Sequence, residues 1–137
     1  MVFLPKLRIQ GLLIFISILF AACDPAQSIY LENRTSAPAT VLFTFNAGSE
    51  SYRFPEANES NTFLVSLDTT GASQEIYFGL GTWKIQSSLD SLVAAVASIE
   101  IKSERSSESF VGAQQVRTFF TERIPKKRKS RIEIILE

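Results

Sequence analysis

The sequence predicts a mainly β fold, namely an antiparallel β-sandwich, immunoglobulin-like in architecture, with one short helix. Short segments of alternating apolar residues recur roughly every 8 to 15 residues and are separated by polar turn clusters, a spacing typical of sandwiches and barrels. Phenylalanine is plentiful, at 11 of 137 residues, and aromatic side chains suit the half-buried surface of a pleated sheet. A single segment has clear helical rather than alternating periodicity.

The first half of the predicted domain contains five candidate strands, at residues 28–32, 40–46, 50–54, 62–67 and 75–78. Val41, Phe43 and Phe45 occupy alternate positions, and a period of two places them on one face of a strand. The same alternation in residues 62–67 places every second side chain of that strand on its inward face. Residues 47–49 form a turn sequence and predict a hairpin between the second and third strands.

The second half contains the helix and five further candidate strands. Residues 82–86 are expected to be a strand, and residues 88–97 the helix, because Leu89, Leu92 and Val93 have the i, i+3, i+4 spacing of one helical face. Alternation resumes around Ile99, and residues 103–109 are expected to be a polar loop. The remaining predicted strands are a short edge at residues 110–112 and a closing antiparallel pair at residues 116–122 and 130–136.

The amino-terminal residues have the organisation of an export signal. Lys6 and Arg8 come first, a nearly unbroken apolar run occupies residues 11–22, and the single cysteine, Cys23, follows. A positive region, an apolar region and small residues before a cleavage point are typical of a secretory signal peptide. The apolar run is much shorter than the roughly 20 residues that a bilayer-spanning helix needs. An uncleaved signal anchor is therefore the weaker alternative.

The segment Phe20-Ala21-Ala22-Cys23 resembles the lipobox of bacterial lipoproteins, with Phe20 where that pattern prefers Leu, Val or Ile. The resemblance covers only this short part of the chain. It implies cleavage between Ala22 and Cys23, a diacylglycerol thioether on Cys23, and a further acyl chain such as palmitate on the new amino terminus. Two acyl chains hold a protein stably on a membrane, whereas one binds marginally. The expected location is the cell envelope, lipid-anchored, facing the periplasm or the cell exterior.

These observations divide the chain into a lipoprotein signal peptide (residues 1–22), the lipidated cysteine with a short tether (23–27) and a β-sandwich domain (28–137). Residues 24–27 reach no more than about 15 Å when extended. The domain is therefore expected to lie close to the membrane surface. Because acylation would consume the only thiol, no disulfide framework is expected.

The charge balance argues against nucleic acid as a partner. The full chain carries 14 Lys+Arg and 14 Asp+Glu, and cleavage after Ala22 would remove Lys6 and Arg8 but no acidic residue. Nucleic-acid-binding domains usually carry a basic excess. The expected partner is the membrane, through the lipid on Cys23, with an envelope protein or a glycan as a further partner class.

One cluster near the carboxyl terminus is strongly basic and is expected at the tip of the closing hairpin. Five cations at such a tip would suit contact with phospholipid head groups or another anionic surface. The alternative is a solvated loop whose charges oppose strand-to-strand aggregation. The cluster consists of Lys126, Lys127, Arg128, Lys129 and Arg131.

Two other groups of side chains have a structural and a functional interpretation. Core packing is the favoured role of the aromatic set, and a carbohydrate- or peptide-binding face is its alternative. Solvation is the favoured role of the acidic group, and a calcium site is its alternative. The aromatic set is Tyr52, Phe54, Tyr77, Phe78 and Trp83, and the acidic group is Glu50, Glu56 and Glu59.

Catalytic chemistry is sparse in this sequence. The chain has no histidine, which removes Ser-His-Asp and Cys-His catalysis together with the commonest metal ligand. We therefore expect no catalytic residue, no metal and no cofactor, and a non-enzymatic role in binding or envelope structure. The alternative is an envelope enzyme that uses paired carboxylates, such as a glycosidase, whose two acids would lie about 5 to 9.5 Å apart. A third possibility is an assembly subunit that pairs through a sheet edge.

Overall fold

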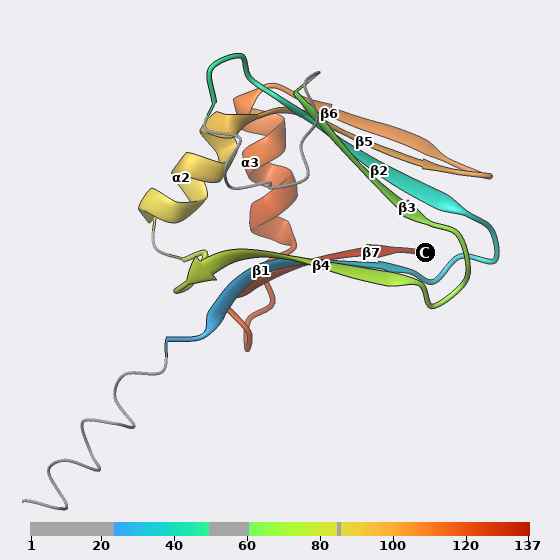
Figure 1. Cartoon of the computed structure of the whole chain (residues 1–137), viewed down its shortest axis with the longest axis horizontal. Coiled ribbons are helices and arrows are strands. Elements are labelled where there is room, and N and C mark those ends of the chain that lie inside the picture. Colours follow the sequence, from blue (N-terminus) through green and yellow to red (C-terminus); the bar gives the residue numbers. More distant parts are fainter. Residues whose placement is uncertain (1–23, 50–60, 85) are drawn as a thin grey trace, which may run out of the picture.

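The computed structural model describes residues 24–49, 61–84 and 86–137 of the chain. In these residues strands predominate, and they form two open sheets of three and four strands accompanied by two helices (Figure 1). The prediction of a mainly β fold is confirmed. The prediction of one helix is wrong, because a second helix precedes the last strand.

The sheets have the strand orders β4-β1-β7 and β3-β2-β5-β6. The three-stranded sheet contains β1 (Ala26–Asn33), β4 (Ser73–Leu80) and β7 (Arg131–Leu136). The four-stranded sheet contains β2 (Ala39–Phe45), β3 (Thr62–Leu67), β5 (Val96–Ser103) and β6 (Ser107–Val111). All neighbouring strands are antiparallel except β1 and β7, which run parallel.

The parallel pair corrects the expected closing hairpin. Residues 116–122 are not a strand but part of α3 (Ala113–Glu122), which carries the chain from β6 in one sheet to β7 in the other. Parallel neighbours need a long connection rather than a tight turn. Val116, Phe119 and Phe120 have the spacing of one helical face and are all buried. Burial of this face between the sheets outweighs the strand preference of its β-branched and aromatic residues.

The first helix agrees with its prediction apart from its bounds. It is α2 (Gln86–Ala95), it begins two residues earlier than expected, and it buries Leu89, Leu92 and Val93. The chain passes from Ala95 directly into β5. Residues 82–84 are not in a strand, which corrects the strand expected at 82–86, and residues 107–109 belong to β6 rather than to a loop.

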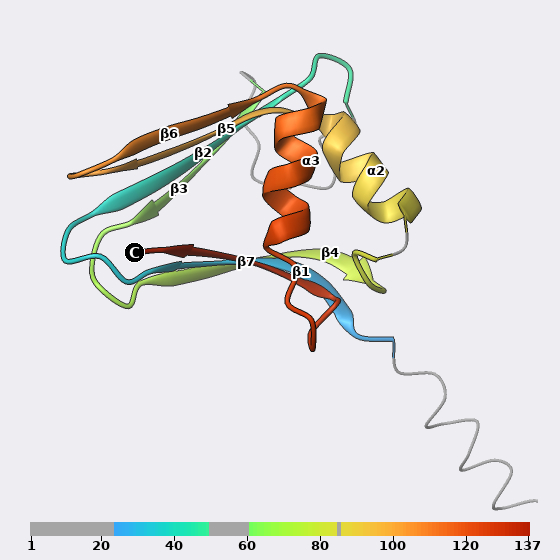
Figure 2. The same ribbon diagram turned by 180° about the vertical axis from the view of Figure 1, so that it is seen from behind.

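The apolar faces of both sheets and both helices share one core. The sheets converge on one side and diverge on the other, where α2 and α3 lie between them (Figures 1 and 2). Alternation in β2 and β3 points every second side chain into this core, as expected. The exposed fraction is below one tenth for Val41, Phe43, Phe45, Phe63, Val65 and Leu67, and also for Ile132, Ile134 and Leu136 on β7.

The side on which the sheets converge, here called the closed end, is crossed twice by the chain, at residues 34–38 and 68–72. The buried side chain of Asn33 joins the two crossings. Its Nδ2 donates to the carbonyl oxygens of Ala37 (2.8 Å) and Leu67 (2.9 Å), and its Oδ1 accepts from the backbone N–H of Thr35 (2.9 Å). Because a buried amide is costly unless its hydrogen bonds are made, this network stabilises the convergence of the sheets.

Some expectations lie outside the described residues. These are the signal peptide with Ala22 and Cys23, the strand at 50–54, and the acidic group Glu50, Glu56 and Glu59. Among the residues that the structure describes, no helix is long and apolar enough to span a membrane.

Candidate functional site

The chain enters the fold at the divergent end of the three-stranded sheet. β1 begins at Ala26, two residues earlier than expected, so the tether described by the structure is reduced to Asp24 and Pro25, both exposed. The Pro25 carbonyl oxygen accepts a hydrogen bond from the Gly81 N–H (2.9 Å), and Ala26 pairs with Leu80. The entry point of the chain is therefore held against the end of β4.

The basic loop, residues 126–129, lies beside this entry point. It connects α3 to β7, which corrects its expected place at the tip of a strand hairpin. The carbonyl oxygen of Lys129 accepts from the Trp83 N–H (2.8 Å), and that of Ser130 accepts from the Ser28 N–H (2.9 Å). The backbone of the loop is thus attached to β1 and to the segment after β4.

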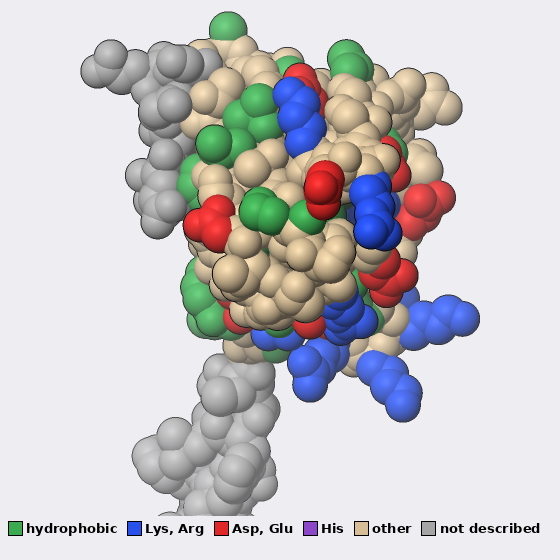
Figure 3. All heavy atoms as spheres, turned by 90° about the vertical axis from the view of Figure 1, so that its right-hand side faces the viewer, with side chains coloured by type: hydrophobic (Ala, Val, Ile, Leu, Met, Phe, Trp, Pro, Cys, Tyr) green, Lys and Arg blue, Asp and Glu red, His purple; other side chains and the backbone are tan. Residues whose placement is uncertain are grey.

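The side chains of the basic loop project away from this support. Lys126, Lys127, Arg128 and Lys129 are all exposed, and within the described part of the chain none of them forms an ion pair. Lys and Arg side chains gather along the lower margin of the face in Figure 3, at the height of the α3–β7 connection in Figure 1. Four of the five predicted cations therefore form one solvent-facing group.

The fifth cation, Arg131, is engaged within the sheet. Its Nη2 lies 2.8 Å from Oε1 of Glu75, and its guanidinium carbon lies 4.8 Å from the centre of the Tyr30 ring. Its side chain is 26% exposed. Arg131 therefore supports the outer face of the three-stranded sheet, beneath the basic loop.

Glu75 is the centre of this polar network. Its carboxylate also accepts hydrogen bonds from Ser28 Oγ (2.7 Å) and from the Tyr77 hydroxyl (3.0 Å). Burial acts to raise the pKa of Glu75, but these two hydrogen bonds and the positive charge of Arg131 outweigh it, so the pKa is lowered. The hydrogen bond between the Tyr77 hydroxyl and Glu75 also raises the pKa of Tyr77. Glu75 is therefore a structural carboxylate that stays ionised.

A shallow cavity of about 260 Å³ connects the tether, the sheet and the basic loop. Pro25 lines it on the tether side, Tyr77 and Arg131 line it on the sheet, and Arg128 and Ser130 line it on the loop side. It offers guanidinium, hydroxyl and aromatic groups to solvent. We refer to this cavity, whose lining also includes Ala26, Ser28 and Glu75, as the tether-end dish.

Two large apolar side chains are exposed at the same end. Leu80 is 73% exposed and Tyr77 is 62% exposed. Gly79 and Gly81 flank Leu80 and have φ values of 119° and 131°, which residues with side chains rarely adopt. The exposure of Leu80 was not predicted from the sequence, in which the Gly-Leu-Gly pattern is its only signal.

The aromatic set is divided between core and surface. Trp83 is 1% exposed, its Nε1 donates to the Ser28 carbonyl oxygen (2.9 Å), and its ring packs edge-on against Phe78 at 5.3 Å. Trp83 therefore has the core role that the sequence favoured. Tyr77 lies on the surface of the dish, and Tyr52 and Phe54 lie outside the described residues.

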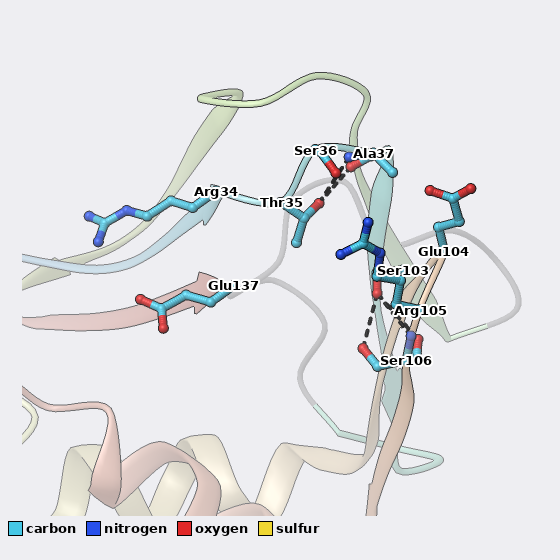
Figure 4. A pocket seen from close by; sticks show the side chains of 9 residues that line it. All are labelled: Arg34, Thr35, Ser36, Ala37, Ser103, Glu104, Arg105, Ser106 and Glu137. Atoms are coloured by element: carbon cyan, nitrogen blue, oxygen red, sulfur yellow. Dashed lines mark hydrogen bonds between the residues drawn. The ribbon is translucent and has the colours of Figure 1, made fainter.

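A second cavity, of about 330 Å³, lies at the closed end between the first crossing, the β5–β6 turn and the carboxyl terminus (Figure 4). Its charged groups do not converge on one point. Arg34 forms two 3.0 Å contacts with Glu32, which lower the pKa of that carboxyl. Glu104 and Glu137 lie on opposite sides of the cavity and point away from each other (Figure 4). Glu104 and Glu137 therefore do not form the pair of facing carboxylates that a glycosidase uses.

Metal chemistry has no evident location in the described ranges 24–49, 61–84 and 86–137. They contain no group of three or more His, Cys, Asp or Glu side chains placed to hold a metal ion.

Comparison with known proteins gives no relative: no family model, no curated protein and no solved structure matches this chain. Any function must therefore be argued from the residues and their geometry.

Proposed function

We propose that this chain is a membrane-anchored bacterial lipoprotein of the cell envelope, with a small non-enzymatic domain that acts in binding or in envelope structure. Cleavage would fall between Ala22 and Cys23, and lipid on Cys23 would hold the domain at the membrane, facing the periplasm or the cell exterior. The sequence from Lys6 to Cys23 supports this proposal through its resemblance to a lipobox-type signal.

The observation that carries the proposal is the place where the chain enters the fold. Only Asp24 and Pro25 separate Cys23 from the first residue of β1, and three extended residues span at most about 11 Å. Ala26 lies in the same end of the molecule as the basic loop and the exposed Leu80. A lipid on Cys23 would therefore bring cationic and apolar side chains to the membrane surface, where both are favourable.

A binding role is better supported than a carboxylate enzyme. A glycosidase needs a general acid whose pKa is raised. The described carboxyls with a clearly shifted pKa, Glu32 and Glu75, both have it lowered, and both are engaged with an arginine. These features favour structural roles for the two carboxylates.

We also propose that the two sheets together form a β-sandwich whose divergent side is filled by α2 and α3, immunoglobulin-like in its general architecture. The shared core of both sheets supports the sandwich. Beyond the membrane, an envelope protein or a glycan is the proposed partner class, and the exposed Leu64 on β3, outside the core, marks a surface available to it.

Metabolic labelling with an alkyne-bearing palmitate tests the lipid anchor. The native chain should incorporate the label, the Cys23→Ala variant should incorporate none, and a Phe20→Leu variant, which restores the preferred lipobox residue, should incorporate at least as much as the native chain. Label that persists in Cys23→Ala, or is absent from the native chain, would overturn the proposal.

A further inference from the structure

We infer that the tether end holds a second, non-covalent membrane contact, in which the tether-end dish and the basic loop bind the phosphate groups of anionic phospholipids. The inference rests on the proposed lipid anchor and names the ligand of the surface next to it. The ligand is the headgroup layer of the same membrane that would hold Cys23.

The charge of this surface favours phosphate. Lys126, Lys127 and Lys129 are exposed ammonium groups, and Arg128 places a guanidinium at the rim of the dish. Arginine matches the geometry of phosphate with paired N–H donors. Arg131 and Glu75 neutralise each other inside the dish, so the unpaired cations of the loop dominate its charge.

The apolar groups favour a bilayer over a soluble anion. Leu80 is 73% exposed at the end of β4, directly opposite Ala26, and Tyr77 is 62% exposed on the dish. An apolar side chain beside cations fits the boundary between head groups and acyl chains, and tyrosine is enriched at that boundary. A soluble phosphate would give Leu80 no partner.

The short tether favours the same membrane. Three extended residues place Ala26 no more than about 11 Å from the Cys23 backbone. Ser130, the residue after the basic loop, accepts a hydrogen bond from the Ser28 N–H of β1. The loop would therefore be confined next to the head groups. This confinement raises the effective concentration of the second contact, so weak individual ion pairs suffice.

Spin labelling of the anchored protein in lipid nanodiscs tests the inference. Acylation would consume the only native thiol, so a Leu80→Cys chain carries one nitroxide, whose apolar ring replaces the leucine side chain. Leu64→Cys is the matched control, because Leu64 is also exposed, at 56%, but lies on the other sheet. Discs of phosphatidylcholine alone are compared with discs in which phosphatidylglycerol replaces about a third of the lipid.

The label at position 80 should become protected from a water-soluble relaxation agent in the anionic discs only, and high salt should remove this protection. The label at position 64 should stay accessible in both. Adding Lys127→Ser and Arg128→Ser should lower the docked-to-free ratio roughly fivefold for each cation removed. The control pair Lys102→Ser, near the end of β5, and Arg105→Ser, in the β5–β6 turn, should leave the ratio unchanged.

Intact mass of the same preparation separates the two proposals. If Cys23 is acylated but position 80 is equally accessible in both kinds of disc, the phospholipid contact is overturned and the anchor stands. Equal loss of protection in the two double variants would also overturn the contact. If Cys23 carries no lipid in the protein isolated from cells, both proposals fail together.

Discussion

Two buried amide side chains stand at opposite ends of β1 and differ in how they are satisfied. Asn33, at the closed end, is 0% exposed, and both polar atoms of its side chain, Nδ2 and Oδ1, form hydrogen bonds that join the two sheet crossings. Gln27, at the tether end, is 6% exposed, and within the described part of the chain its Nε2 has no partner. At the start of β1 a buried side-chain amide therefore lacks one hydrogen-bond partner, and at the end of β1 a buried side-chain amide has all the partners it needs.

The two ends of the molecule therefore have different structural roles. At the closed end the sheets meet through backbone crossings that Asn33 ties together. At the tether end the sheets diverge, helices fill the space, and Leu80 and the basic loop face solvent. An exposed apolar side chain and exposed cations therefore lie at the end where we propose the membrane contact, whereas the closed end joins the two sheets.

The largest effect is expected from removing the strand that runs between both ends. A chain ending at Lys129 loses β7, whose Ile132, Ile134 and Leu136 are buried and whose backbone pairs with β1. Each such side chain contributes about 1.5 to 3 kcal/mol, against a total stability of about 5 to 15 kcal/mol. We expect no cooperative thermal transition by circular dichroism. A cooperative melt of the truncated chain would contradict the importance of this strand.

Breaking the closed end with Asn33→Ala should cost about 3 kcal/mol of unfolding free energy. The substitution leaves the buried carbonyl oxygen of Leu67 without its donor, and an unsatisfied buried group costs about 1 to 3 kcal/mol. Asn46→Ala is the control, since its amide makes one exposed hydrogen bond to the Ala94 carbonyl oxygen. Urea denaturation should separate the two variants, and equal losses would refute the special role of Asn33.

Acid should weaken the tether end through Glu75. Because its pKa is lowered in the folded state, the carboxylate stabilises the fold above the ordinary value of 4.5, and this stability is lost as pH falls through the lowered pKa. Glu75→Gln should therefore cost about 1 to 2 kcal/mol at neutral pH, and the difference from the native chain should shrink in acid. Glu133→Gln, on the same face of the sheet opposite Tyr30, is the matched control and should cost less at neutral pH, because Glu133 is not part of the network around Glu75. A constant Glu75→Gln deficit in urea titrations from pH 7 to pH 3 would contradict this assignment.

The smallest effect sharpens the contrast between the two amides. Gln27→Met keeps the length of the side chain and removes the unpartnered Nε2, so it should stabilise the fold by about 1 kcal/mol. The change should appear as a higher midpoint in urea with an unchanged slope. Destabilisation by Gln27→Met would contradict this contrast, because it would mean that the buried amide is satisfied in the fold.

The strands that sequence alone predicted well are those with one buried and one solvated face. Val41, Phe43 and Phe45 alternate with half-buried positions, and such a pattern specifies both the strand and its inward face. The helix at α2 was predicted for the same reason, because Leu89, Leu92 and Val93 have helical spacing. In each case the local period and the final burial agree.

The failures occur where distant contacts decide the structure. Helical spacing is also present in Val116, Phe119 and Phe120, but β-branched and aromatic residues favour strands. These residues form a helix because its apolar face is buried in the space between the diverging sheets. The parallel pairing of β7 follows from that helix and has no local signal. Arg131 belonged to the predicted basic cluster, yet its pairing with Glu75 arises from residues more than fifty positions apart.

The lipid anchor on Cys23 is tested most directly by the mass of the amino-terminal tryptic peptide of the protein extracted from cell membranes. Trypsin cuts after Arg34, and no Lys or Arg lies between Cys23 and Arg34. If Cys23 is the lipidated amino terminus, this peptide begins at Cys23 and carries at least two acyl chains. A peptide that begins at Ile9, continues through an unmodified Cys23 and ends at Arg34 would contradict it.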